Sequence, residues 1–182
     1  MKKIHIILFF SLLTTLFVSC ERADYYEEIK ETYREAERLS TSGAVIDGNM
    51  WSARSEKWMT FREAEDYCYY LDELGYSDWR LPTVDELRTL IQNCNGNEAG
   101  GTCSITDDCI LHGSGCGDND TNCSCCETNY DGSYSKLGDT TDLWSSLPAK
   151  NTHPDRAWIG YFPSGCITTR ETGYSAAIRC VR

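Results

Sequence analysis

Apolar residues recur at helical spacing in two stretches of the chain. In residues 61–74 they lie three or four positions apart, so we expect one buried helix face that ends at Gly75. The residues of this face are Phe61, Ala64, Tyr67, Cys68, Leu71 and Leu74. Thr60 precedes the face and Glu63 stands three positions later, which is the spacing of a capping box at a helix start.

A second helix is predicted directly after Pro82. Thr83 and Glu86 repeat the capping-box spacing. Three apolar residues then share one helix face, which we expect to be buried: Leu87, Leu90 and Ile91.

The run from Asp78 to Ile91 is the most distinctive in the chain, yet it holds no obvious catalytic group. Its charged residues, Arg80, Asp85 and Glu86 among them, are better explained by structure. We expect acidic neighbours to hold Arg80 and Glu86 to cap the helix.

Short apolar runs predict strands on both sides of these helices. Residues 44–53 are typical of a β-hairpin around the turn signal Asp47-Gly48. Further strands are predicted near the C-terminus over residues 143–146, 157–162, 166–169 and 176–181, with turns at 163–165 and 173. Strands so closely spaced favour an antiparallel meander. The sequence therefore predicts an α+β domain with two helices, a small antiparallel sheet and one long loop insertion.

The first twenty residues are typical of a bacterial export signal. Lys2 and Lys3 precede an apolar run, residues 4–18, that is too short to span a membrane. The run ends in Ser19-Cys20 and resembles a lipobox. We therefore expect residues 1–19 to be removed and Cys20 to carry a lipid, with a plain secretory signal as the alternative. This predicts a cell-envelope location, at the outer membrane or cell surface.

Residues 20–43 are predicted to connect this anchor to the domain, which would span residues 44–182. Residues 21–40 are densely charged, contain no Gly or Pro, and carry a thin apolar stripe of Ala23, Tyr26, Ile29, Tyr33 and Ala36. We interpret them as a helical stalk. A short coiled coil and a helix docked on the domain are the alternatives.

The net charge restricts the partners. The chain carries −11, and loss of Lys2 and Lys3 leaves 15 Lys and Arg against 28 Asp and Glu, a charge of −13. A nucleic-acid partner is therefore not expected. The acidity also favours a basic or neutral ligand over sulfated glycans.

The cysteine content predicts disulfide bonds. Eleven cysteines are present, and the ten that remain beside Cys20 are an even number in an exported chain, which favours disulfides over metal-bound thiolates. Most of them lie in or beside an acidic insertion, residues 95–142, that lacks sustained periodicity: Cys94, Cys103, Cys109, Cys116, Cys123, Cys125 and Cys126. Cross-links would order this insertion. Cys166 is a further half-cystine, and we expect the adjacent Cys125 and Cys126 to bond different partners.

Two metal sites are alternatives to this interpretation. A zinc site would use His112 with Cys116, Cys123, Cys125 and Cys126. A calcium site would use Asp118, Asp120 and Asn122, which alternate as at the start of a calcium loop, but Asn129 and Cys123 stand where an EF-hand has Glu and Gly. We predict disulfides and no cofactor, and keep calcium as the secondary candidate.

Nothing in the sequence predicts an enzyme. Outside the export signal the only histidines are His112 and His153, and neither stands in a recognisable hydrolase context.

Several motifs together resemble the Lcl C-terminal domain, a bacterial family of largely unknown function named for a collagen-like adhesin. In order, they are Trp51-Ser52-Ala53, the helix with Tyr67 and Cys68, the run Gly75–Thr83, Leu143–Ser146, Ala157-Trp158 and the ending Ile178–Arg182. The resemblance covers about residues 44–182. It implies a fold related to C-type lectins and sulfatase-modifying factors, with loops on one side that carry binding.

The resemblance also implies that Cys68 pairs with Cys180. It says little about the cysteine-rich insertion, which is a variable region. The calcium-dependent sugar motifs of true C-type lectins are absent from the chain, so sugar binding by that route is not supported.

Together these observations predict a cell-surface lipoprotein with a non-catalytic domain that binds an extracellular polysaccharide or protein. The four tryptophans at positions 51, 79, 144 and 158 are expected in the core. One of them exposed beside Tyr161 or Tyr174 would form a stacking surface for sugar or peptide, so the candidate ligand residues are Trp158, Tyr161 and Tyr174. The alternatives are an envelope lipoprotein without a specific ligand and a receptor diversified by a retroelement.

Overall fold

The structure, a computed structural model, describes Lys30 and residues 43–112, 123–149 and 154–182. The chain divides into two units, Met1–Arg38 and Leu39–Arg182, and all described residues except Lys30 belong to the second. The described part of this unit is a small α+β fold. It contains helices α2 (Phe61–Tyr70), α3 (Val84–Leu90) and α4 (Asp107–His112) and two antiparallel sheets. The expected signal, the lipidation site Cys20 and the stalk up to residue 42, apart from Lys30, lie outside the described residues.

The first sheet is the predicted hairpin. Strands β1 (Ala44–Ile46) and β2 (Asn49–Trp51) pair through Ala44 with Trp51 and Ile46 with Asn49. Asp47 and Gly48 connect them with φ of 49° and 86°, the left-handed values that a tight two-residue hairpin turn requires.

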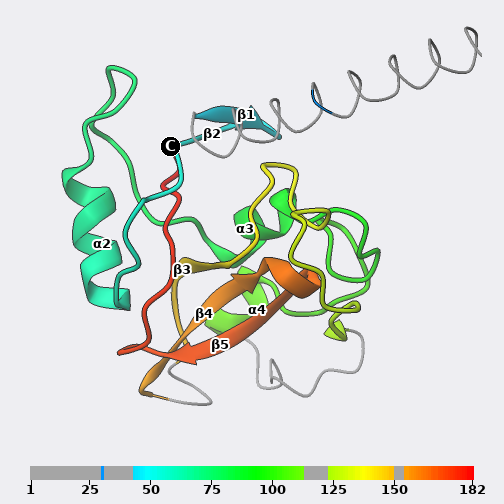
Figure 1. The fold of residues 1–182 in the computed structure, drawn as a ribbon. Helices are drawn as coiled ribbons and strands as arrows, with labels where there is room; N and C mark the ends of the chain where they lie inside the picture. The colour runs from blue at the N-terminus through cyan, green and yellow to red at the C-terminus, as the bar shows by residue number, and fades with distance from the viewer. Residues whose placement is uncertain (1–29, 31–42, 113–122, 150–153) are drawn as a thin grey trace, which may run out of the picture. The chain divides into compact units, whose positions relative to one another are not determined.

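The second sheet has the strand order β3-β4-β5: Asp142–Pro148, Arg156–Tyr161 and Cys166–Glu171. One face carries Trp144 and Ile159 and packs against α2 and the C-terminal segment. The other face carries Leu143 and Trp158 and packs against α3. The sheet therefore separates two layers of core, with α2 on one side and α3 on the other (Figure 1).

Both predicted capping boxes are present. The backbone N–H and the hydroxyl of Thr60 donate to Glu63 Oε2 at 2.9 and 2.7 Å, and Thr83 N–H donates to Glu86 at 2.8 Å. The hydroxyl of Thr83 accepts from the Glu86 N–H at 3.3 Å. The sequence thus predicts the starts of α2 and α3 to the residue.

The end of the first predicted helix was wrong. Helix α2 ends at Tyr70 rather than at Gly75, and Leu74 is 58% exposed instead of buried. The following residues form a turn in which Leu74 and Gly75 have φ of 57° and 80°. Glu73 fixes this turn, because its carboxylate accepts the Ala53 N–H at 2.8 Å and its backbone bridges Tyr76.

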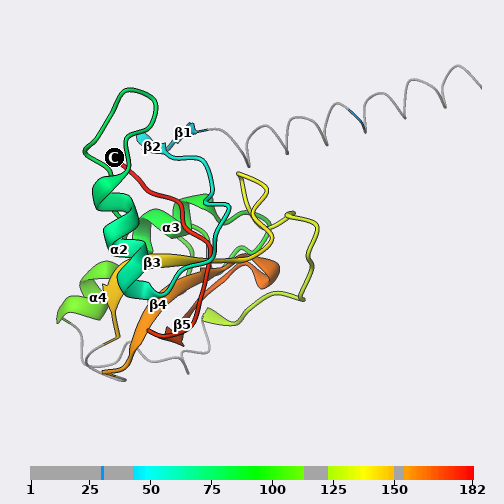
Figure 2. The same cartoon turned by 60° about the vertical axis from the view of Figure 1, so that its left-hand side comes forward.

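The C-terminal segment, residues 176–182, is not the regular strand that its pattern predicts. Residues 176–181 are all buried, and they form single bridges to separate parts of the chain. Ala176 bridges Met59, Ala177 bridges Leu143, and Val181 bridges both Trp51 and Arg80. The segment runs beside α2 in both ribbon views (Figures 1 and 2). The segment has no single partner strand because it forms bridges to several different elements.

One disulfide fixes this segment to α2. Cys68 on the buried face of α2 bonds Cys180, the pair that the family resemblance implies. The bond closes a sequence separation of 112 residues, for which chain entropy gives about 4 to 5 kcal/mol as an upper figure.

The insertion is cross-linked as expected, and it also contains an unpredicted helix. The disulfides are Cys94–Cys126, Cys103–Cys123 and Cys125–Cys166, so the adjacent Cys125 and Cys126 do bond different partners. Cys109 is also disulfide-bonded. With Cys123, Cys125 and Cys126 oxidised, the zinc alternative loses three of its thiolates.

The unpredicted helix α4 is short and is locked to the start of α3. Asp107 accepts the backbone N–H groups of Val84 and Asp85 at 2.9 and 3.2 Å, while Asp85 accepts the Asp107 N–H at 3.2 Å. Six residues give too little periodicity for a helix to be recognised in the sequence.

A buried ion pair joins the end of the insertion to the C-terminal segment. The guanidinium of Arg179 lies 3.0 to 3.1 Å from the carboxylate of Asp139, and both side chains are fully buried. Arg179 also donates to Ser52 O at 2.9 Å, and Asp139 accepts from Ser135 at 3.1 Å. Arg179 and Asp139 therefore neutralise each other's charge in a part of the core that is closed to water.

No helix in the described residues is long and apolar enough to cross a membrane.

We predict that Asp139→Asn lowers the free energy of unfolding by about 3 to 5 kcal/mol, because it leaves the Arg179 charge buried without its partner. Urea unfolding followed by tryptophan fluorescence measures the change. Asp47→Asn is the matched control, since Asp47 pairs with Lys136 at 3.5 Å on the exposed surface, and its loss should cost about 1 kcal/mol or less. Equal effects of the two variants would contradict the role assigned to the buried pair.

Candidate functional site

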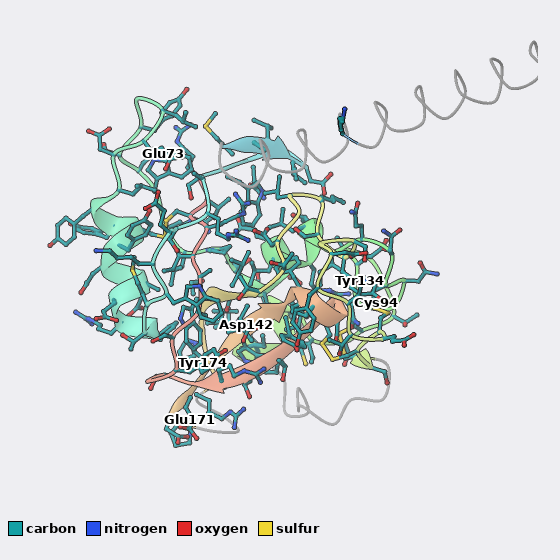
Figure 3. The ribbon with its side chains drawn as sticks, in the orientation of Figure 1. Glu73, Cys94, Tyr134, Asp142, Glu171 and Tyr174 are labelled. Carbon is teal, nitrogen blue, oxygen red and sulfur yellow. A yellow bond between two sulfur atoms is a disulfide. The ribbon has the colours of Figure 1, made fainter. Side chains whose placement is uncertain are left out.

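Partly exposed aromatic side chains gather around one arginine at the end of the three-stranded sheet. We call this cluster the aromatic patch and define it as Tyr130, Tyr161, Arg170 and Tyr174 above the buried Asp142. Two of the predicted ligand residues, Tyr161 and Tyr174, are therefore brought together. Figure 3 shows Asp142 and Tyr174 close to each other at this end of the molecule.

The sheet register places the patch. Asp142, the first residue of β3, stands opposite Tyr161, the last residue of β4. Arg170 on β5 stands opposite Ala157, four positions before Tyr161, so both side chains belong to the same face of the sheet. Tyr174 follows the turn after β5.

Arg170 is the centre of the patch. Its guanidinium carbon lies 5.5 Å from the ring centroid of Tyr161 and 5.6 Å from that of Tyr174, within the range of cation–π attraction. Its Nε lies 3.3 Å from Asp142 Oδ2. Its Nη1 donates to Thr169 O at 3.5 Å, and a third of the side chain remains exposed.

Asp142 is buried beneath these groups, with 4% of its surface exposed. Burial raises the pKa of its carboxyl group, and the charge of Arg170 and a hydrogen bond with Tyr174 offset this only in part. Oδ2 makes the ion pair with Arg170 but no well-formed hydrogen bond. A buried carboxyl group with a raised pKa beside a partly exposed cation makes this surface a candidate functional site.

Tyr174 belongs to the patch through its ring and its hydroxyl. Its ring meets Trp144 edge to face with centroids 6.4 Å apart. Burial and the Asp142 charge raise its pKa. Tyr174 is 38% exposed, so part of its side chain is accessible to a ligand.

Tyr130 is the patch residue that the sequence did not indicate. It is 67% exposed and comes from the insertion, yet its side chain is hydrogen-bonded to that of Tyr161. This bond is the main reason that the pKa of Tyr161 is raised to about 12. No periodicity or motif surrounds Tyr130, so only the folded chain reveals that it belongs here.

The third predicted ligand residue, Trp158, is not part of this surface. It is 1% exposed and packs in the core between the sheet and α3, so it is unavailable for stacking. Trp51, Trp79 and Trp144 are also at most 3% exposed, as expected for core residues.

The distinctive run from Asp78 to Ile91 is structural, as predicted. Arg80 makes a two-pronged ion pair with Glu86 at 2.6 and 2.7 Å. Asp78 pairs with Arg182, whose guanidinium also lies 3.6 Å from the Tyr76 ring centroid. These contacts join the run to the C-terminal segment.

The remaining candidates contribute no site that the structure describes. The calcium candidates Asp118, Asp120 and Asn122 lie outside the described residues, as do Cys116 and His153. His112 is exposed at the end of α4. Within the described ranges, no group of three or more His, Cys, Asp or Glu is placed to hold a metal ion.

Comparison with known families agrees with the motifs. The model of the Lcl C-terminal domain matches residues 45–182, so the chain belongs to that family. No curated protein matches the chain.

We predict that Asp142→Asn makes the protein relatively more stable as the pH rises. A carboxyl group whose pKa is raised binds its proton more tightly in the folded than in the unfolded state. Its contribution to stability therefore falls as the pH rises from the ordinary value of 3.8 through the folded-state pKa. Asn carries no charge at any pH, so the variant lacks this loss.

Urea unfolding of both proteins over a series of pH values measures the difference in unfolding free energy. The difference should shift in favour of the variant as the pH rises above about 4. A shift in the opposite direction would show that Arg170 over-compensates the buried charge.

Proposed function

We propose that this chain is an exported, lipid-anchored surface protein whose domain binds polysaccharide at the aromatic patch without catalysing a reaction. The observation that carries the proposal is the position of Arg170 within 5.6 Å of two partly exposed tyrosine rings. Export and anchoring rest on the first twenty residues of the sequence. A C-type-lectin-like arrangement, with binding loops gathered on one side, is part of the same proposal.

The chemistry of the patch suits a sugar. Sugar rings present a flat face of C–H groups that packs against tyrosine rings, and their hydroxyl oxygens accept hydrogen bonds from a guanidinium. Tyr161 and Tyr174 supply the rings, and the exposed part of Arg170 supplies the donors. A few polar groups on an aromatic surface fix the orientation of a ligand in this way.

The charge balance favours an uncharged ligand. Asp142 neutralises Arg170 from below, so the centre of the patch has no net charge. The rest of the chain is strongly acidic, which repels sulfated or otherwise anionic glycans. A neutral polysaccharide is therefore the ligand class that we propose.

The side chains of the aromatic patch also suit a domain that binds a ligand without catalysing a reaction. The patch contains phenols, a guanidinium and one buried carboxylate, and its described residues include no nucleophile beside a base. Asp142 is accessible only through the residues above it. It is placed to orient Arg170 rather than to touch a substrate.

We expect Tyr161→Ala and Tyr174→Ala each to weaken polysaccharide binding by about tenfold, because each removes one stacking surface. A glycan array with the purified full chain in detergent identifies ligands, and titration calorimetry measures the affinities. Tyr69→Ala is the matched control, since Tyr69 is 72% exposed on α2 and contacts Tyr70 rather than the patch.

The array also separates this proposal from its alternatives. Binding to peptides alone, with the same loss in the two patch variants, would indicate a protein ligand. Retention of polysaccharide binding in both variants would place the ligand elsewhere. The absence of any ligand among glycans and proteins would favour an envelope protein with a structural role.

A further inference from the structure

One segment of the insertion is fastened along the turn that follows β4. The N–H of Cys126 donates to Ser164 O at 2.9 Å, and the N–H of Asn129 donates to Pro163 O at 2.6 Å. The hydroxyls of Thr128 and Ser164 share a hydrogen bond at 2.8 Å. We call residues 125–130 the clamped segment.

Disulfides hold the same segment at its beginning. Cys125 bonds Cys166, the first residue of β5, and Cys126 bonds Cys94 at the start of the insertion. The turn itself, Phe162–Ser164, is buried, and Gly165 follows it with a φ of 56°. A Cβ at Gly165 would lie 2.9 Å from Cys94 Cβ and 3.2 Å from Tyr134 Cβ, so glycine permits the close approach. Figure 3 shows Cys94 and Tyr134 beside each other here.

These hydrogen bonds and disulfides determine the position of Tyr130. The turn begins directly after Tyr161, and the clamped segment runs along the turn to Tyr130. The two phenols therefore meet, although they lie 31 positions apart in the sequence. No helix or strand is present in residues 124–130, so the disulfides and these hydrogen bonds hold the segment.

We propose that the insertion supplies Tyr130 as a specificity-determining residue of the aromatic patch, positioned there by the Cys125–Cys166 disulfide. This inference rests on the proposed function, because it assigns a further residue to the same ligand surface. Tyr161 and Tyr174 provide the general stacking surface. Tyr130, at the edge of the patch, selects among ligands by offering an exposed ring and a hydroxyl held by Tyr161.

The positioning step is tested without any ligand. In protein labelled with ¹³C at the tyrosine Cζ, the Tyr161 signal is assigned with Tyr161→Phe and its titration is followed with pH. Wild type should titrate near pH 12, whereas Tyr130→Phe should bring the midpoint toward 10, the ordinary value. Tyr70→Phe removes an exposed phenol on α2 and should leave the midpoint unchanged.

The disulfide is tested in the same experiment. Replacing Cys125 and Cys166 together with serine should also bring the Tyr161 midpoint toward 10, because Tyr130 is no longer held beside it. Dispersed amide signals in this variant show that the fold persists. An unchanged midpoint in that folded variant would overturn the positioning role of the disulfide.

The specificity step is tested on the glycan array. Tyr130→Ala should change the ratio of affinities for the two best ligands by about tenfold, and the double serine variant should change it in the same direction. An unchanged ratio in Tyr130→Ala, with binding still lost in Tyr161→Ala, would overturn this inference and leave the proposed function standing. Failure of wild type to bind any glycan or protein would overturn both, while the titration still reports where Tyr130 lies.

Discussion

The buried C-terminal segment is the constraint on which the other elements depend. It is hydrogen-bonded to the hairpin through Ser52 and Met50, and it is cross-linked to α2 through Cys180. At its centre the Arg179 charge is buried, and a buried cation is tolerated only with a partner such as Asp139. The fold is thus complete only when the last seven residues of the chain have reached the middle of the molecule.

This arrangement explains how the domain accommodates a long insertion. The insertion leaves after α3, and Asp139 near its end is paired with the C-terminal segment, so both of its ends are anchored in the core. Between these anchors, disulfides act together with the buried side chains of Ile105, Ile110 and Leu137 to order the insertion. The Cys125–Cys166 disulfide holds one segment of the insertion against the sheet.

The sequence predicted what depends on local chemistry. The capping boxes at Thr60 and Thr83 and the hairpin turn at Asp47 involve neighbouring residues, and each was correct. The predictions for the end of α2 and for the last strand were wrong. Both features depend on contacts with distant segments, which Glu73 makes to Ala53 and the C-terminal segment makes to several elements. Cys125 and Cys126 could be assigned to different partners, but no sequence rule identified those partners.

The candidate site shows the same limit. Tyr161 and Tyr174 could be named as candidates and both lie beside Arg170, whereas Trp158 is 1% exposed and belongs to the core that was expected for the tryptophans. The sequence did not identify Arg170 or Asp142 as site residues, because charged residues are common in short strands. What distinguishes Asp142 is its burial, which raises the pKa of its carboxyl group. Because this carboxyl group lies beside the cation Arg170 and below two partly exposed tyrosine rings, its raised pKa marks the patch as a candidate site.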